Sequence, residues 1–490
     1  MRKLMALAFC LILVAVAVPA KAASKIEFEG ELTVLHHNLV NFNRANDKRY
    51  VQSDSFFENR LHFGVDFKPS DDLLVHWSFR SPDYVRWGVA TQGSSNAAEV
   101  YTRAIYATIT QEWGELSIGR LEEGFPTSNQ GLATLGYGYG GDLIYISPFD
   151  NASVVDGISY TKKFDNGFGI NVYYAKDATQ DTDASVQRID KDIDIDRFGV
   201  EPFYQWEGGG ASLLFEYVRD MTDNIVISPT NQLIVDVRKD KDYAFFINPA
   251  VMQTWGAFSL RFEGKIGWGE TTERDLLNNN ARAKTKNKGL GLYGEANYNY
   301  GAGDINLIAW FADGSSWRER LDPKATKHDL VDMGDFAPFL VAYYGNTLPN
   351  RVSNFADINH YNAGAVNSYG LIDRGILGNG NNHWGIGILG NHSLTDSIKL
   401  NYGIGYFELV EAYRLGDLLG IRGGDDKDLG VEVDLGVHIQ LMENLSFESQ
   451  FGYMFNGNAY QNVYEDRNGN FVFSDPKDTY AWVSALTVTF

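Results

Sequence analysis

The sequence predicts an all-β protein, a transmembrane, antiparallel, up-and-down β-barrel of about 18 strands, with 16 strands as the alternative. Three observations predict this fold. Apolar and polar residues alternate with a period of two along most of the chain, and helical periodicity is nearly absent. Short turns alternate with long polar connections, as in barrels whose hairpins have turns at one end and loops at the other.

The first 22 residues have the features of a secretory signal peptide. Arg2 and Lys3 supply positive charge, and Leu4–Val18 is an apolar core followed by small residues. The apolar run spans about 15 residues, fewer than the roughly 20 that a membrane-crossing helix needs. We therefore expect residues 1–22 to be a cleaved signal peptide and residues 23–490 to form one barrel domain.

Strand after strand shows the same alternation. In the first predicted strand, Ile26 and Phe28 fall on one face, whereas Glu27 and Glu29 fall on the other. In hydrocarbon every backbone N–H and C=O must be paired, which only helices and closed barrels achieve. The apolar face should therefore contact lipid and the polar face should line the lumen. The same alternation recurs in the segments 61–67, 73–79, 258–268, 429–439, 445–455 and 480–490.

The connections give the strand number. Between predicted strands lie long polar stretches, including Ala178–Asp196 and Ala312–Asn381. Eight short turns are predicted near residues 69–72, 112–114, 165–167, 207–210, 255–257, 299–303, 394–397 and 442–444. With both chain ends on the turn side, these connections predict 18 strands, or 16 if the segment Tyr243–Val251, interrupted by Pro249, is not a strand. We expect short periplasmic turns and long extracellular loops.

The part of the chain between Thr102 and Phe168 carries a family resemblance. The strand Thr102–Ile109, the hairpin Glu112–Arg120 and the segment Asp150–Tyr160 resemble the general Gram-negative homotrimeric outer-membrane porins. The long loop near the C-terminal third departs from the enterobacterial pattern and suits the deltaproteobacterial branch. The resemblance implies a homotrimer that lets small hydrophilic solutes and ions diffuse passively, without enzymatic activity or cofactor. A barrel of 16–18 strands is wide enough for an aqueous channel.

The resemblance also implies a constriction. In general porins the third outer loop folds into the lumen, and here that loop is the segment 121–153. The candidate pore-constriction residues are Arg60, Arg80, Arg103, Arg120, Glu122, Glu123 and Asp142. Acids on the loop that face arginines on the wall would set a transverse field that tunes ion preference. The net charge of −21 predicts mild cation selectivity and disfavours nucleic-acid binding. Arg261, Glu263 and Lys265 should face the lumen and pair with charges across the wall.

Two other functions remain as alternatives. A solute-selective channel for a sugar or an anion would have a similar barrel. A sugar channel could use aromatic residues that face the lumen, but the outward parity of the tryptophans argues against this. We therefore assign the following residues to interfacial girdles: Trp77, Trp206, Trp255, Trp268, Trp482 and Phe490. An outer-membrane hydrolase is disfavoured because the nine histidines are scattered singly, whereas a triad needs a positioned histidine. The spacing of potential ligands predicts no metal site.

The final strand predicts a partner. Its outward parity set ends on Phe490, and a closing strand with a terminal aromatic residue resembles the signal that the barrel assembly machinery recognises. The other expected partners are outer-membrane lipid and lipopolysaccharide. The expected location is the outer membrane of a Gram-negative bacterium, reached by export through the inner membrane.

Overall fold

The computed structural model describes residues 24–40, 53–80, 85–86, 101–121, 155–177, 195–220, 225–227, 233–235, 242–275, 281–316, 319, 325–326, 328, 331, 339, 382–412, 426–460, 462–465, 471–474 and 478–490. The predicted signal peptide, 1–22, lies outside these residues. In the described part of the chain no helix has the length and apolarity needed to cross a bilayer.

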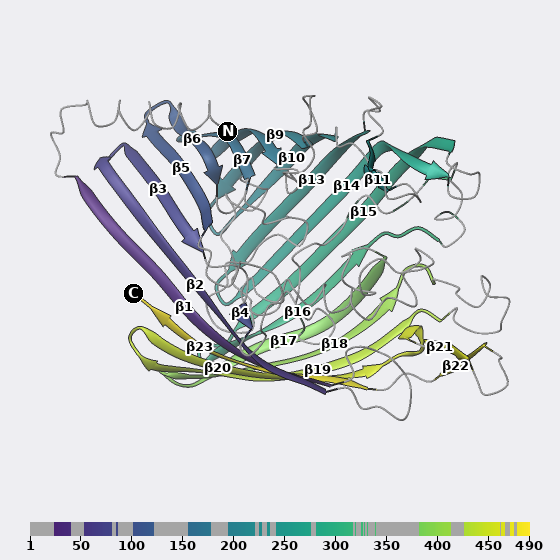
Figure 1. Ribbon diagram of the computed structural model, residues 1–490. Helices are drawn as coiled ribbons and strands as arrows, with labels where there is room; N and C mark the ends of the chain where they lie inside the picture. The colour runs from purple at the N-terminus through teal and green to yellow at the C-terminus, as the bar shows by residue number, and fades with distance from the viewer. Residues whose placement is uncertain are drawn as a thin grey trace.

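One antiparallel sheet closes on itself to form the barrel (Figure 1). Its members are β1 (Lys25–Val40), β2 (Ser53–Ser70), β3 (Leu73–Arg80), β4 (Val85–Arg86), β5 (Tyr101–Gln111), β6 (Gly114–Leu121), β7 (Val155–Lys163), β8 (Phe168–Asp177), β9 (Ile195–Trp206), β10 (Gly209–Asp220), β13 (Asp242–Trp255), β14 (Phe258–Asp275), β15 (Ala281–Asn299), β16 (Gly303–Ala312), β17 (His383–Thr395), β18 (Ile398–Leu409), β19 (Asp428–Met442), β20 (Leu445–Asn456) and β23 (Thr479–Thr489). Short elements β11 (Ile225–Ile227) with β12 (Leu233–Val235), and β21 (Asn462–Glu465) with β22 (Phe471–Ser474), form separate hairpins, and η4 (Asn458–Tyr460) is a 3₁₀ turn.

The barrel has 18 strands, as predicted. The sheet contains 19 elements, but β4 pairs with β2 beyond the end of β3 and so continues the β3 strand. Each strand pairs with its sequence neighbours, and β1 pairs with β23 to close the ring. In Figure 1 the purple β1 runs beside the yellow β23. At this seam the backbone N of Gly30 donates to the carbonyl of Phe490 at 2.8 Å, and the N of Phe490 donates back at 3.0 Å.

All eight predicted turns connect neighbouring strands, which confirms the alternation of turns and long connections. Several turns use a glycine with positive φ. Gly167, Gly208, Gly256 and Gly301 have φ of 84°, 77°, 59° and 90°, a region that a residue without a Cβ adopts freely. The alternative of 16 strands is excluded because β13, which contains Pro249, is a full strand paired on both edges.

Two prolines interrupt the hydrogen-bond ladders around β10. The β9–β10 pairing skips Pro202, and the β13–β14 pairing skips Pro249, whereas Leu213 of β10 still pairs with Pro249. Proline has no N–H to donate, so each ring removes a ladder bond. Gly264 lies opposite Pro249, and a Cβ there would be in ordinary van der Waals contact with the ring, 3.5 Å from the proline Cγ.

The two faces of the wall have opposite chemistry, as the alternation predicted. Large apolar side chains on the outer face are exposed, among them the predicted girdle residues Trp77, Trp206, Trp255, Trp268, Trp482 and Phe490, at 37–60%. Many of the buried side chains on the inner face are polar, among them Thr33, Asn171, Ser212, Asn248, Asn297, Asn306 and Asn401. The barrel is therefore inverted relative to a water-soluble protein, as hydrocarbon outside and water inside require.

A continuous aromatic row crosses the outer face of β8, β9, β10, β13 and β14. Its members are Tyr174, Phe198, Tyr217, Phe245 and Trp268, and successive ring centroids lie 5.0, 6.3, 4.8 and 6.0 Å apart. Two residues closer to the loop end, a second row of outer-face positions lies in register from β6 to β15. We call it the outer charged row. Its residues carry charges that mostly alternate in sign, with one tyrosine: Arg120, Asp156, Lys176, Asp196, Arg219, Tyr243, Glu270 and Lys286. An aromatic row followed by a charged row is the order expected at the membrane interface, where the hydrocarbon core meets the lipid head groups.

Candidate functional site: the inner wall of the barrel

The inner wall carries an excess of buried acids. Within the described ranges, seven carboxylate side chains on inward-facing positions are 0–8% exposed: Glu201, Glu216, Glu263, Glu295, Glu432, Asp434 and Glu448. Arg261 is the one arginine or lysine of that burial in the same ranges. We call these seven residues the inner acids. They come from β9, β10, β14, β15, β19 and β20, so they surround a large part of the lumen.

Neutral groups hold several of these acids. Asn171 donates to the carboxylate of Glu201 at 2.7 Å, the hydroxyl of Tyr173 donates to Glu216 at 2.9 Å, and the hydroxyl of Tyr293 donates to Glu295 at 2.8 Å. Such donors satisfy a carboxylate without cancelling its charge. Arg197 approaches Glu216 only to 4.0 Å. Among the buried side chains of the described inner wall, carboxylates therefore outnumber arginines and lysines.

Arg261 and Glu263 both face the lumen, as predicted, but they pair along β14. The Nε of Arg261 donates to Glu263 Oε1 at 2.7 Å, and the guanidinium lies 5.9 Å from the centroid of the Tyr293 ring on β15. Same-face neighbours two residues apart on a strand can reach one another in this way. The sequence suggested partners across the wall, and in register Arg261 lies directly opposite Glu295 of β15. Lys265, the third residue, lies 4.8 Å from the centroid of the Phe246 ring.

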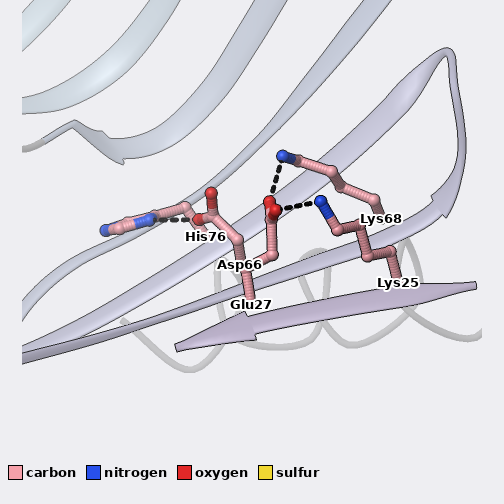
Figure 2. A network of polar contacts seen from close by, with 5 residues as sticks. All are labelled: Lys25, Glu27, Asp66, Lys68 and His76. Carbon is pink, nitrogen blue, oxygen red and sulfur yellow. Dashed lines mark hydrogen bonds and ion pairs between the residues drawn. The ribbon is translucent and has the colours of Figure 1, made fainter. Parts of the chain in front are cut away.

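A second charged network lines the turn-end mouth of the barrel (Figure 2). Glu27 of β1 accepts ion pairs from Lys25 of the same strand and Lys68 of β2. Asp66 of β2, directly opposite Glu27 in register, lies 2.7 Å from the Nδ1 of His76, its register partner on β3. Figure 2 shows these side chains pointing to the same side of their strands. Acids and bases alternate here, so negative and positive charges are more nearly equal at this end of the barrel than among the buried residues of the inner wall.

Three of the predicted constriction arginines lie on adjacent early strands. Arg60 of β2 pairs with Thr33 of β1, and Arg80 of β3 pairs with His62 of β2; their side chains lie outside the described part of the molecule. Arg103 lies at a bulge: Ser78 of β3 pairs with Ala104, and Phe79 pairs with Thr102. Two residues of β5 thus oppose one position of β3.

The bulge decides which side of the wall Arg103 lies on. Uninterrupted alternation would group Arg103 with Ile105 and Ile109. At a bulge the extra residue falls on the same side as its neighbour, which here is the fully buried Ala104. Thr102 then returns to the outer face, where its hydroxyl accepts a 3.3 Å hydrogen bond from the exposed Trp77. The bulge thus places Arg103 on the inner side.

Arg120 lies on the opposite side of its strand. Its Nε donates to Asp156 Oδ1 at 2.9 Å and its terminal nitrogen to Oδ2 at 3.1 Å. Asp156 has the parity of Ile158, which is 44% exposed on the outer face. Alternation therefore puts the Arg120–Asp156 pair on the outer side at the loop end, in the charged row. Leu121, one residue later, is buried inward with Tyr173.

The predicted constriction loop, 121–153, is described only at Leu121, and Glu122, Glu123 and Asp142 lie outside the described residues. The structure reveals another inward segment that the sequence analysis missed. Val331 and Phe339, both from the long connection after β16, are fully buried against the inner wall. Three glycines at inward positions of β15, β17 and β18 leave room for these two residues: Gly289, Gly387 and Gly405. These glycines are the feature of the sequence that could have indicated an inward segment. In these ranges no group of three potential metal ligands occurs.

The family of the chain follows from the comparison of its sequence with family models. Residues 6–243 match the family described as Gram-negative porin. Over these residues the chain is a Gram-negative porin. No curated protein matches it. The match includes the strands that carry Arg60, Arg80 and Arg103 and ends at the start of β13.

Solved outer-membrane proteins resemble the porin over nearly its full length. OmpT of Vibrio cholerae, in its trimer form, is 13% identical, with 96% of this chain and 100% of that chain covered and a TM-score of 0.39. OpdK of Pseudomonas aeruginosa is 10% identical (95% and 99%, TM-score 0.45), and OccAB4 of Acinetobacter baumannii is 10% identical (96% and 99%, TM-score 0.47). The family match and the closed 18-strand barrel together make this chain an outer-membrane porin channel.

Proposed function

We propose that this porin is a passive, mildly cation-selective channel for small hydrophilic solutes and ions, without enzymatic activity or cofactor. The observation that carries the proposal is the set of inner acids, seven buried carboxylates against one buried arginine. Between low-dielectric walls, charges act over longer distances than they do in bulk water. Cations therefore enter the lumen more readily than anions do.

Planar-bilayer recording across a KCl gradient tests the selectivity. We expect a reversal potential that favours potassium over chloride, reduced in the Glu201→Gln variant because the substitution removes one negative charge from the inner wall. Glu270→Gln is the matched control, since Glu270 lies in the outer charged row. A chloride-favouring reversal potential in the unmodified porin would refute cation selectivity. Saturation of the current by one sugar or anion would favour the solute-selective alternative.

The constriction by the segment 121–153 belongs to this proposal. Glu122, Glu123 and Asp142 of that segment would face Arg60, Arg80 and Arg103 on the wall. Support comes from the adjacent positions of the three arginines on β2, β3 and β5 and from the bulge that turns Arg103 inward. The outer-face position of Arg120 supports a role at the rim instead.

We also propose a homotrimer, in contact through the seam between β1 and β23. Polar groups lie on the outer face there, near the middle of β20 and β23 and closer to the loop end of β1 and β2. Ser449 and Ser484 are 3.1 Å apart, Trp482 donates to Ser449 at 2.8 Å, and His36 contacts Ser55 at 3.1 Å. Polar and ionisable groups at this depth are costly when they face lipid, and a second copy of the chain would shield them.

Bulk introduced at the seam tests the trimer. Ser484→Trp should convert a trimer on native gels into monomers, whereas Val200→Trp, on the outer face of β9, should leave the trimer intact. An unmodified porin that runs as a monomer would refute the trimer, and equal trimer stability in both variants would place the contact elsewhere. Export by a cleaved signal peptide, assembly through Phe490, and contact with lipopolysaccharide complete the proposed path to the outer membrane.

A further inference from the structure

The connection that follows β16 folds back to the foot of that strand. The backbone N of Asn382 donates to the carbonyl of Asp313 at 2.9 Å, so the two ends of the connection meet. Within the connection, His328 Nδ1 lies 2.8 Å from Asp313 Oδ2, and the N of His328 donates to Ser315 Oγ at 2.7 Å. Residue 328 is thereby held next to residues 313–315, at the loop end of the wall.

Three residues further on, the chain lies directly on the inner wall of β15. Val331 is fully buried, and its backbone N would lie only 2.5 Å from a Cβ placed on Gly289. Gly289 has the inward parity of Tyr293 and Glu295. Only a glycine leaves room for a backbone to approach a strand so closely.

Phe339 occupies a socket on β17 and β18. Gly387 and Gly405 pair with each other in register, and a Cβ on either would lie 2.5 or 2.4 Å from the Cζ of Phe339. The Phe339 ring meets Phe407 edge to face at 5.2 Å between centroids, and Trp310 lies 6.3 Å away. All three aromatic side chains are 0–3% exposed. Because Gly387 and Gly405 have no side chains, they leave a space on the inner wall that the Phe339 ring fills.

The socket lies inside the barrel. Gly387 is the fifth residue of β17, and a strand rises about 3.3 Å per residue, so it lies roughly 13 Å along the strand from His383. Glu432, one of the inner acids, pairs in register with Gly405. Phe339 is therefore at the level of the charged lumen and not at the rim.

We propose that the connection after β16 forms an arm that is fastened to the inner wall at Val331 on β15 and at Phe339 on β17 and β18, and that this docked arm narrows the pore. The inference rests on the proposed channel function. Phe339 acts as a positioning residue, because its ring fastens the arm to the wall. The exclusion limit for solutes then depends on the glycine socket as well as on the segment 121–153.

A cross-link tests the docking itself. Phe339→Cys combined with Gly405→Cys should form a disulfide in the folded porin, since the only natural cysteine, Cys10, lies in the predicted signal peptide. Phe339→Cys combined with Gly294→Cys is the matched control, because Gly294 lies on β15 with nothing within 4 Å of its Cβ position. No disulfide in the first pair, or equal yield in both pairs, would overturn the docked arm.

Conductance tests the effect on the pore. Phe339→Ala and Gly387→Ala should raise the single-channel conductance and admit larger neutral polyethylene glycols, whereas Gly294→Ala and the outward Ile388→Ala should not. Unchanged conductance and exclusion in Phe339→Ala would refute the narrowing. If the unmodified porin shows no conductance at all, the channel function fails, while the cross-link still reports whether the arm is docked.

Discussion

Arg261 and Glu263, two residues apart on β14, form an ion pair that runs along the strand on the inner wall, with side chains 5% and 2% exposed. Arg261 also lies over the ring of Tyr293, whose hydroxyl holds Glu295. One arginine therefore organises two of the inner acids. Because both side chains are buried, water cannot take the place of one residue when that residue is substituted.

Arg261→Met should destabilise the barrel by about 3–5 kcal/mol, because it leaves the Glu263 carboxylate buried without its cation. The double variant Arg261→Met, Glu263→Met should recover most of that loss, since two apolar residues of similar volume replace both charges. Urea unfolding in liposomes, followed by tryptophan fluorescence, measures both. A double variant no more stable than the single one would show that the pair is not the source of the loss.

In the outer charged row, burial should decide the cost of losing an arginine. Arg219 donates to Asp196 at 3.1 Å through Nε, and the Asp196 side chain is 4% exposed. Arg219→Leu should therefore cost about 1–3 kcal/mol, even with the Tyr174 hydrogen bond retained. Arg120→Leu should cost no more than about 1 kcal/mol, because Arg120 and Asp156 are both more than a third exposed. Equal losses in the same urea titration would contradict this ranking.

Arg103 supplies a test of ion preference. Arg103→Ala removes a positive charge from the inner side of the bulge, so the reversal potential in a KCl gradient should move further toward that of potassium. Arg219→Ala, which removes the same charge from the outer face, should leave the reversal potential where it was. If both variants behave alike, Arg103 does not line the pore.

Phe490 supplies a test of assembly in cells. The residue is 60% exposed, and its backbone closes the seam with Gly30. Phe490→Ala should lower the amount of folded porin in the outer membrane, measured by heat-modifiable gel mobility. Phe455→Ala, at an outer-face aromatic that is 52% exposed on β20, serves as the control. An equal yield for both variants would argue against recognition of the terminal ring.

The strand faces and turns were predictable because each depends on neighbours in sequence. The alternation of Ile26 and Phe28 with Glu27 and Glu29 follows from the two-residue period of a strand. The bulge at Arg103 was not predictable in this way, because it appears only when β5 is paired with β3. The sequence likewise does not reveal that Arg261 pairs along its own strand, since a partner across the wall was equally compatible with its parity.

The docked arm was harder to predict, since its anchors are far apart in sequence. Val331 and Phe339 lie in a connection without periodicity, and their partners are glycines on three other strands. Gly387 and Gly405 lie at inward positions that would otherwise carry side chains. Glycines that face each other there indicate that another part of the chain fills the space, but this pairing is visible only once the register is known.

The two prolines beside β10 have a mechanical consequence. A barrel drawn out of a membrane by one end unravels hairpin by hairpin, and each step must break the ladder between neighbouring strands. Pro202 and Pro249 have already removed bonds from the β9–β10 and β13–β14 ladders. Under a pulling force these two ladders therefore resist separation less, per residue, than ladders of the same length without a proline would.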